Sequence, residues 1–128
     1  MSEKQKLLIV DDSELNRDIL KEILGSSYDY LEAENGNQAI QILEVHPEID
    51  LMLLDINMPQ MNGFQVLEHM RELQWIDEVP VVMISSEESV EIMRKAYDLG
   101  ITDYISRPFD AVIVKKRVQN TLGLYANQ

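Results

Sequence analysis

Acidic residues stand directly after two short apolar segments of this chain. Asp11 and Asp12 follow residues 7–10, and Asp55 follows residues 51–54. Two carboxylates about 4 Å apart repel each other by roughly 4 kcal/mol at an effective dielectric constant near 20, so a cluster of three must take up protons or a cation. Ligands that offer only oxygen favour Mg²⁺. If the fold gathers these residues, the sequence predicts a magnesium site, with Mn²⁺ as an alternative ion.

A carboxylate beside a divalent cation can act as a nucleophile toward a phosphoryl group. Asp55 is the expected acceptor because it ends the most apolar segment, whereas Asp11 and Asp12 are expected to hold the metal from the side. Ser85 and Arg107 follow two further apolar segments and are expected to donate hydrogen bonds to phosphoryl oxygens. The predicted chemistry is therefore transfer of a phosphoryl group onto Asp55.

Each of these residues also has an ordinary structural interpretation. The aspartates could cap a helix or a turn, Ser85 could form a capping box with Glu88, and Arg107 could pair with a surface carboxylate. For one aspartate alone the structural role is favoured. For three aspartates at the ends of adjacent strands the metal site is favoured.

Apolar segments alternate with stretches of helical spacing along the chain. The segments are nearly unbroken in apolar character, which is typical of parallel strands covered on both faces. The expected strands are 7–10, 28–33, 51–54, 81–84 and 101–105. The expected helices end at Gly25, at His46 and Pro47 and at Gly100, and two others begin at Gly63 and after Pro108. The apolar faces of the first and fourth helices are expected to include Leu15, Ile19, Ile23, Val90, Met93, Ala96 and Tyr97.

Five strand and helix units predict an α/β fold of the flavodoxin-like, doubly wound (βα)5 type. This is a three-layer sandwich around a parallel five-stranded sheet of order 2-1-3-4-5. Strands one and three are neighbours in that order, which would bring the acidic residues together. A chain of 128 residues suits a single domain, 1–128.

These motifs resemble a known family. Four features carry the resemblance: the acidic pair after the first strand, residues 55–63 (Asp-Ile-Asn-Met-Pro-Gln-Met-Asn-Gly), the hydroxyl residue after the fourth strand, and the basic-Pro-Phe turn after the fifth. Together they resemble the response regulator receiver domain of two-component signal transduction, of the chemotaxis-regulator type. The resemblance covers essentially the whole chain.

The resemblance implies a role for each matching residue. Asp11, Asp12, Asp55 and the backbone carbonyl of Asn57 would bind Mg²⁺. Asp55 would accept the phosphoryl group from the phosphohistidine of a sensor histidine kinase or histidine phosphotransfer protein, or from a small phosphodonor. Such a domain is a phosphoacceptor in a phosphorelay that assists only its own phosphorylation and dephosphorylation, so we do not expect an enzyme.

Further positions match the family's switch and its control of phosphate lifetime. Ser85 and Tyr104 would form the switch, although Tyr104 also fits an ordinary half-buried strand residue. Asn57 and Glu87 match the positions that tune dephosphorylation, and their polar side chains predict a quick loss of phosphate.

One residue departs from the family pattern. Arg107 stands where the family has lysine, and the two cations are not interchangeable because arginine is larger and forked. Phosphorylation is expected to survive, whereas coupling to the output is in question. The resemblance also implies a cis peptide bond between Arg107 and Pro108.

The family's partners suggest two interaction surfaces. The kinase or phosphotransfer protein would dock near the first helix, and the output would pass through helix four, strand five and helix five, a face that could also form a homodimer. A C-terminal output domain such as a diguanylate cyclase is a further expectation, because no stop signal ends the last helix. The candidate residues are Asn16, Ile19 and Leu20 for docking, and Ile92, Lys95, Tyr104 and Val114 for output.

Composition narrows the alternatives. A net charge of -12 argues against direct nucleic-acid binding, and Lys115, Lys116 and Arg117 are expected to form a solvated helix face. The chain has no cysteine and no segment that suggests membrane insertion, so a cytoplasmic location is expected. Two other functions stay open. A pseudo-receiver would work without phosphate, and a haloacid-dehalogenase-type phosphatase is remote because its Asp-x-Asp pattern after the first strand is missing.

Overall fold

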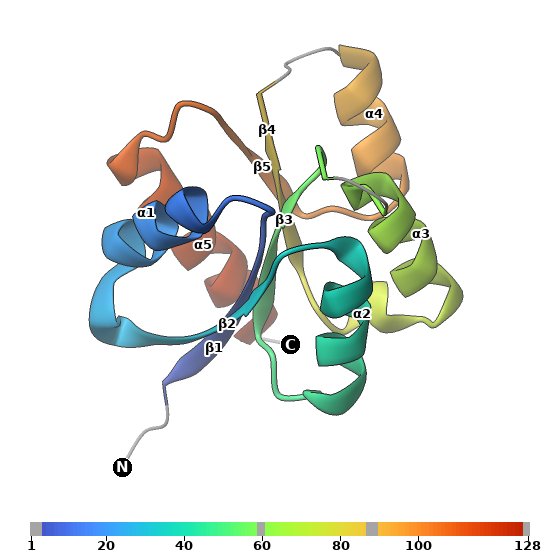
Figure 1. The fold of residues 1–128 in the computed structure, drawn as a ribbon, viewed down its shortest axis with the longest axis horizontal. Helices are drawn as coiled ribbons and strands as arrows, with labels where there is room; N and C mark the ends of the chain where they lie inside the picture. Colours follow the sequence, from blue (N-terminus) through green and yellow to red (C-terminus); the bar gives the residue numbers. More distant parts are fainter. Residues whose placement is uncertain (1–3, 59–60, 87–89, 127–128) are drawn as a thin grey trace.

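A parallel sheet forms the middle layer of the molecule (Figure 1). The computed structural model describes residues 4–58, 61–86 and 90–126. Within these residues the sheet has five strands in the order β2-β1-β3-β4-β5, and every pairing is parallel, as predicted. The strands are β1 (Gln5–Val10), β2 (Tyr28–Ala33), β3 (Leu51–Asp55), β4 (Val81–Ser85) and β5 (Asp103–Ser106).

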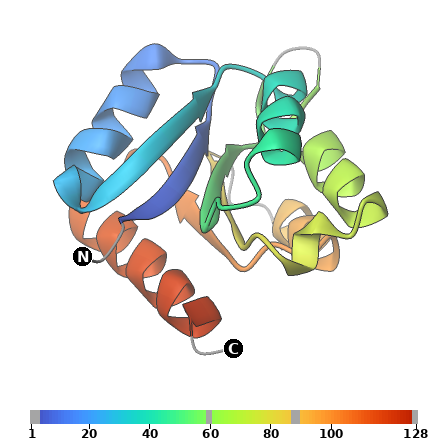
Figure 2. The same cartoon turned by 90° about the horizontal axis from the view of Figure 1, so that it is seen from below.

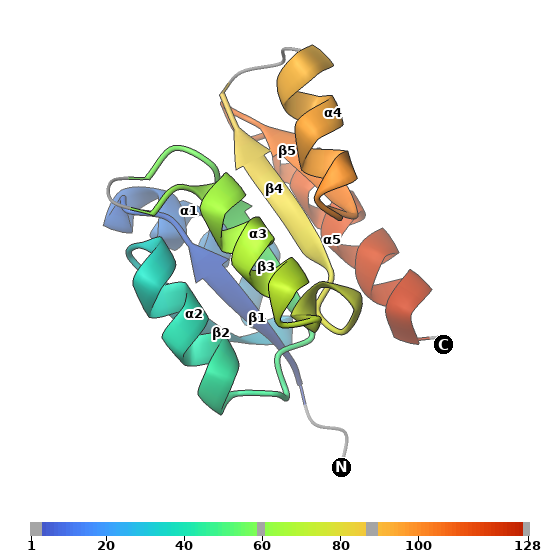
Figure 3. The same ribbon diagram turned by 90° about the vertical axis from the view of Figure 1, so that its right-hand side faces the viewer.

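Helices cover both faces of this sheet. Helices α1 and α5 lie on one face, and α2, α3 and α4 lie on the other (Figures 2 and 3). The three-layer, flavodoxin-like sandwich expected from the sequence is therefore confirmed. The helices are α1 (Glu14–Leu24), α2 (Gly36–Val45), α3 (Gly63–Glu72), α4 (Val90–Asp98) and α5 (Ala111–Ala126), with short 3₁₀ turns η1 (Gly25–Ser27) and η2 (Trp75–Asp77).

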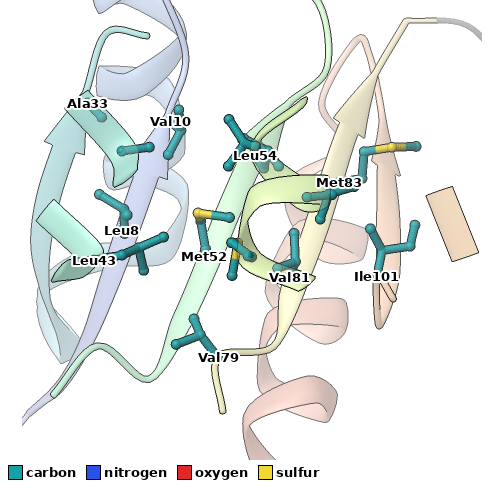
Figure 4. Close-up of a cluster of buried hydrophobic side chains, with 14 of the residues drawn as sticks. Leu8, Val10, Ala33, Leu43, Met52, Leu54, Val79, Val81, Met83 and Ile101 are labelled. Atoms are coloured by element: carbon teal, nitrogen blue, oxygen red, sulfur yellow. The ribbon is translucent and has the colours of Figure 1, made fainter. Parts of the chain in front are cut away.

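The unbroken apolar segments are explained by the two helical layers. Successive side chains of a strand point to opposite faces of the sheet. In β1, Leu7 and Ile9 belong to the core cluster formed with α1 and α5, whereas Leu8 and Val10 belong to the cluster formed with α2, α3 and α4. Figure 4 shows the second cluster, with Leu8 and Val10 pointing to the same side as Met52 and Leu54. Full burial of each such side chain contributes about 1.5–3 kcal/mol, so both layers are needed.

Short polar side chains begin the helices at the carboxyl edge of the sheet. Ser13 caps α1 by accepting the backbone N–H of Asn16 at 3.2 Å. Asn62 caps α3 in a capping box with Gln65, in which each side chain accepts a backbone N–H of the other residue. The N-cap of α1 is thus Ser13, and neither preceding aspartate takes that role.

Gly63 lets α3 begin directly against the end of β3. A Cβ atom at this position would lie 2.7 Å from the carbonyl oxygen of Asp55 and 2.7 Å from the Cα of Ile56. Those two atoms belong to the backbone and have little room to move aside. Glycine is therefore required where the helix passes the strand end that carries Asp55.

The helix faces differ in part from the predicted ones. Leu15, Val90 and Tyr97 were expected on apolar faces, but their relative exposures are 68%, 62% and 45%. The buried residues are Arg17, Leu20 and Leu24 on α1, and Ala96 on α4. The periodicity identified the helices correctly but their buried faces only in part, because Ala96 is buried and Ile23 packs against the core as expected, whereas other apolar residues occur on the solvent side of each helix.

Candidate functional site

The predicted acidic cluster forms at the carboxyl edge of the sheet. Asp11 follows β1 and Asp55 ends β3, and these strands are neighbours, with Val10 paired to Leu54. Asp11, Asp12 and Asp55 each offer a carboxylate oxygen, and the three atoms lie within 4.8 Å of one another. Asp11 and Asp55 are buried, with relative exposures of 0% and 1%, and Asp12 is exposed. The fold therefore joins two buried carboxylates to one that is open to solvent.

Local backbone amides orient the two buried carboxylates. Asp11 Oδ1 accepts the N–H of Ser13 at 2.9 Å, and Asp55 Oδ1 accepts the N–H of Asn57 at 3.0 Å. Both contacts are turns of the kind that aspartate commonly forms two residues ahead of itself. The structural role of a turn is thus real for Asp55, and it coexists with membership of the cluster. In each residue the second oxygen, Oδ2, remains for other partners.

Arg107 joins the two buried carboxylates from the loop after β5. Its Nη2 lies 2.7 Å from Asp11 Oδ2 and 3.1 Å from Asp55 Oδ2. The peptide bond between Arg107 and Pro108 is cis, as expected. The Nε of Arg107 is buried and has no hydrogen-bond partner among the described residues. Arg107 therefore contacts the acidic cluster directly and does not act as a surface ion-pairing residue.

The charges in this cluster influence one another. Burial raises the pKa of Asp55 above its usual value, and the nearby Asp11 raises it further, against the Asn57 amide and the Arg107 charge, which lower it. Burial alone would lower the pKa of Arg107, but the contacts with Asp55 and Asp11 outweigh it, so this pKa is raised. Arg107 stays charged and partly offsets the repulsion among the acids.

The donor set suits a divalent cation of the Mg²⁺ type. Only oxygen atoms are offered, and the exposed position of Asp12 leaves one side of the cluster open to water. Mg²⁺ usually keeps several water ligands and takes one or two carboxylates from the protein. The residues that could hold the ion are therefore the three aspartates, to which the family resemblance adds the backbone carbonyl of Asn57.

Of the remaining predicted site residues, those that the structure describes lie at or near the same edge. Ser85 ends β4, is buried at 3% exposure, and pairs in register with Ser106 of β5. Asn57 is exposed directly beside the cluster, whereas Glu87 and Glu88 lie outside the described residues. Tyr104 is half-buried on β5, which is the strand next to β4.

Two residues proposed for interaction surfaces are placed differently from the prediction. Leu20, expected at the docking surface, and Val114, expected at the output face, are both fully buried at 0% exposure. They pack in the core cluster that α1 and α5 form with the sheet. Both predictions were wrong, because a helix position alone does not distinguish the solvent side from the core side.

Sequence reasoning missed the local roles of two arginines. Arg17 on α1 is buried, and it donates to the Asp11 carbonyl at 2.6 Å. Arg117, expected in a solvated patch, places its guanidinium 4.7 Å from the centre of the Tyr104 ring and donates to the Tyr104 carbonyl. A signal for Arg17 existed in the sequence, because it precedes Leu20 by three residues and Leu24 by seven and so shares one helix face with two leucines.

Comparison with known proteins identifies the family. The response regulator receiver domain family matches residues 7–119. Chemotaxis protein CheY1 of Helicobacter pylori is 34% identical over 120 residues, which cover 92% of this chain and 97% of that protein. The chain therefore belongs to the response regulator receiver domain family of two-component signal transduction.

Solved structures agree with this assignment. The structure of Vibrio cholerae chemotaxis protein CheY4 superposes with a TM-score of 0.83 at 26% identity, covering 93% of this chain and 99% of that one. A two-component response regulator/GGDEF domain protein superposes with a TM-score of 0.87 at 26% identity, covering 94% of this chain but 50% of that one. Receivers of this kind thus occur both alone and joined to an output domain. None of the helices in the described part of the chain combines the length and the apolar character that a membrane span needs.

Proposed function

We propose that this receiver domain accepts a phosphoryl group on Asp55 in a Mg²⁺-dependent reaction and passes the signal on through a change of conformation. The observation that carries the proposal is the cluster of Asp11, Asp12 and Asp55 with Arg107 at one edge of the sheet. Structural turns alone would need neither three clustered acids nor a cation shared between two of them. The domain is a signalling module and not an enzyme that acts on other substrates.

The transfer step is a displacement at phosphorus. A carboxylate oxygen of Asp55 forms a bond to phosphorus as the bond from phosphorus to the donor's imidazole nitrogen breaks. The electron pair of the broken bond stays on that nitrogen, and because the other ring nitrogen of the phosphohistidine carries a proton in the reacting form, the leaving group is neutral imidazole. With acetyl phosphate, the leaving group is acetate. Mg²⁺, held by Asp11, Asp12, Asp55 and the Asn57 carbonyl, would supply positive charge for the phosphoryl oxygens. Mn²⁺ suits the same oxygen ligands.

Ser85 and Arg107 would stabilise the aspartyl phosphate. Ser85 would donate its hydroxyl and Arg107 its guanidinium to phosphoryl oxygens. The buried Nε of Arg107 has no hydrogen-bond partner among the described residues, so its N–H could donate to a phosphoryl oxygen. Arg107 would exchange its present contacts with the acids for contacts with the phosphoryl group.

Tyr104 would report the phosphorylation to the face formed by α4, β5 and α5. As Ser85 moves to the phosphoryl group, Tyr104 would rotate inward from its half-buried position on the adjacent strand. On α4, the Lys95 ammonium lies 4.5 Å from the centre of the Phe64 ring of α3, and the half-buried Ile92 packs against the core cluster formed with α2, α3 and α4. The contacts of these two residues therefore lie toward α3 and the core, so Tyr104 is the residue that carries the proposed signal to this face. A change at this face would control an output or a homodimer.

The partners follow from the same assignment. The donor would be a sensor histidine kinase or a histidine phosphotransfer protein, docking near Asn16 and the half-buried Ile19 of α1. We propose that residues 1–128 form one receiver domain, and a C-terminal output domain such as a diguanylate cyclase would fit the GGDEF domain protein that superposes on this chain. The polar Asn57 and Glu87 would permit quick dephosphorylation. A phosphate half-life of many hours on the isolated domain would count against that last point.

A pseudo-receiver that signals without phosphate is the second candidate. One observation favours it. Arg107 already contacts both Asp11 and Asp55, so a protein cation meets the charge of the buried acids without a metal.

Incubation with acetyl phosphate separates the two candidates. Intact-mass spectrometry and Phos-tag electrophoresis should show one added phosphate that requires Mg²⁺ and is lost in Asp55→Asn. A folded protein that binds Mg²⁺ but gains no phosphate, from acetyl phosphate or from a panel of phosphorylated kinases, would be a pseudo-receiver.

A further inference from the structure

Arg17 is a buried cation beside the acidic cluster with no role in the reaction described so far. Its side chain is 8% exposed, and it extends from α1 toward β1 and β2. Nη1 donates to the carbonyl oxygen of Asp11 at 2.6 Å, and Nε donates to Glu32 Oε1 at 3.0 Å. The guanidinium therefore links the turn that follows β1 to a carboxylate on the neighbouring strand β2.

The oxygen that Arg17 contacts belongs to the peptide group between Asp11 and Asp12. A peptide group is planar, so holding its carbonyl oxygen fixes the orientation of the whole unit. The other side of Asp11 is fixed as well, because its N–H donates to the Ala33 carbonyl at 3.1 Å. These two contacts hold the backbone from which both the Asp11 and the Asp12 side chains extend.

The contacts of Arg17 act more through geometry than through charge. Glu32 lies within ion-pairing distance of Arg17, and it also pairs with Lys21 at 2.9 Å. The positive charge of Arg17 is thus met locally by Glu32 before it reaches the aspartates. Glu32 is exposed, and an ion pair with an exposed partner contributes only about 0–1 kcal/mol, so stability from this pair does not explain an arginine here.

We propose that Arg17 is a positioning residue that sets the geometry of Asp11 and Asp12 as ligands for Mg²⁺. This inference rests on the proposed metal site and extends it to a residue that does not touch the ion. The forked guanidinium spans two acceptors at once, which the single ammonium group of a lysine does not reproduce with the same planar geometry.

Metal selectivity separates a positioning role from a merely structural one. Mg²⁺ demands near-ideal octahedral geometry at about 2.0–2.1 Å, whereas Ca²⁺ accepts flexible arrangements at about 2.3–2.6 Å. Greater freedom of orientation of the peptide group between Asp11 and Asp12 should therefore weaken Mg²⁺ binding more than Ca²⁺ binding. A general loss of stability or of negative charge would lower the affinities for both ions to a similar extent.

The test is a titration of the full chain with MgCl₂ and separately with CaCl₂, followed by NMR of backbone amides. The amide of Asn57 is a suitable reporter because it donates to Asp55 Oδ1. Arg17→Lys should lower Mg²⁺ affinity about tenfold or more, the range seen when the partners of metal ligands are removed, and lower Ca²⁺ affinity less. Lys21→Met is the matched control, because it also removes a cation that pairs with Glu32, whereas the Lys21 ammonium lies against Glu32 and Asp18. The ratio of its Mg²⁺ and Ca²⁺ affinities should equal that of wild type.

Each outcome decides a separate point. If wild type binds no Mg²⁺, the proposed function fails. If wild type binds Mg²⁺ and Arg17→Lys keeps its affinity, or loses both ions equally, the positioning role is overturned and the proposed function stands. Glu32→Gln keeps the arginine but weakens its anchor on β2, so it should shift the ratio in the same direction. Should Arg17→Lys fail to fold in thermal melts, an unchanged ratio in Glu32→Gln would overturn the role.

Discussion

Asp12 is predicted to lower the stability of the metal-free protein. Its carboxylate oxygen lies within 4.8 Å of an oxygen of Asp11 and of Asp55, and it is exposed, whereas the two buried acids share Arg107. At 4.8 Å each like-charge pair costs roughly 3.5 kcal/mol at a dielectric constant of 20 and about 0.9 kcal/mol in bulk water. Because Asp12 is exposed, the repulsion energy of each of its two pairs lies near the bulk-water value. Asp12→Asn should therefore stabilise the metal-free fold by about 1–2 kcal/mol.

Thermal unfolding of wild type and Asp12→Asn, first with EDTA and then with saturating MgCl₂, measures this difference in stability. For a domain of this size about 1–2 kcal/mol corresponds to a rise in melting temperature of roughly 3–8 °C. The distances involved are shorter than the Debye length of about 8 Å at 0.15 M ionic strength, so the effect should persist in ordinary buffers. In saturating Mg²⁺ the wild type gains the binding free energy and the variant gains less, so the difference should shrink or reverse.

Glu44→Gln provides the control for net charge. Glu44 is an exposed acid at the far end of α2, so this variant also changes the net charge by one unit but removes no carboxylate from the cluster. It should leave the melting temperature in EDTA nearly unchanged. An Asp12→Asn protein that melts at or below the wild-type temperature in EDTA would refute the electrostatic reasoning.

Three further results are expected. Gly63→Ala should lower the free energy of unfolding in urea by about 1–3 kcal/mol, because its methyl group would overlap the backbone at Asp55; an unchanged midpoint would contradict the close approach. Hydrogen bonds from Lys21, and then from Arg17, hold the pKa of Glu32 below its usual value. The stability that Glu32 contributes is therefore complete above about pH 4.5 and is lost as the pH falls through the lowered pKa. The melting temperatures of wild type and Glu32→Gln should accordingly become equal in acid. Arg117→Met should release the Tyr104 ring, increasing its mobility in aromatic NMR relaxation; equal relaxation would exclude a restraining contact.

The fold and the acidic cluster could be predicted from the sequence because both depend on topology. Unbroken apolar strands require helices on both faces, and the order of a doubly wound sheet places strands one and three side by side. Asp11 and Asp55 therefore had to meet at one edge, whatever their rotamers. The cis bond before Pro108 was expected from the family resemblance and is present.

Side-chain contacts over longer distances could not be predicted in the same way. Leu20 and Val114 were expected on surfaces and lie in the core, since helical spacing gives a face but not its direction. The bridging of Asp11 and Asp55 by Arg107 depends on the path of the loop after β5, which no periodicity describes. Arg117 was expected in a solvated patch because a run of basic residues is usually exposed, but it contacts Tyr104.

Phosphorylation of Asp55 is tested by locating the phosphoryl group chemically. After incubation with acetyl phosphate and Mg²⁺, reduction with borohydride converts an aspartyl phosphate to homoserine, which peptide mass spectrometry places in the sequence. We expect homoserine at position 55 alone, and none when EDTA replaces Mg²⁺. Homoserine at Asp11 or Asp12 with an unmodified Asp55, or labelling that is independent of Mg²⁺, would contradict this expectation.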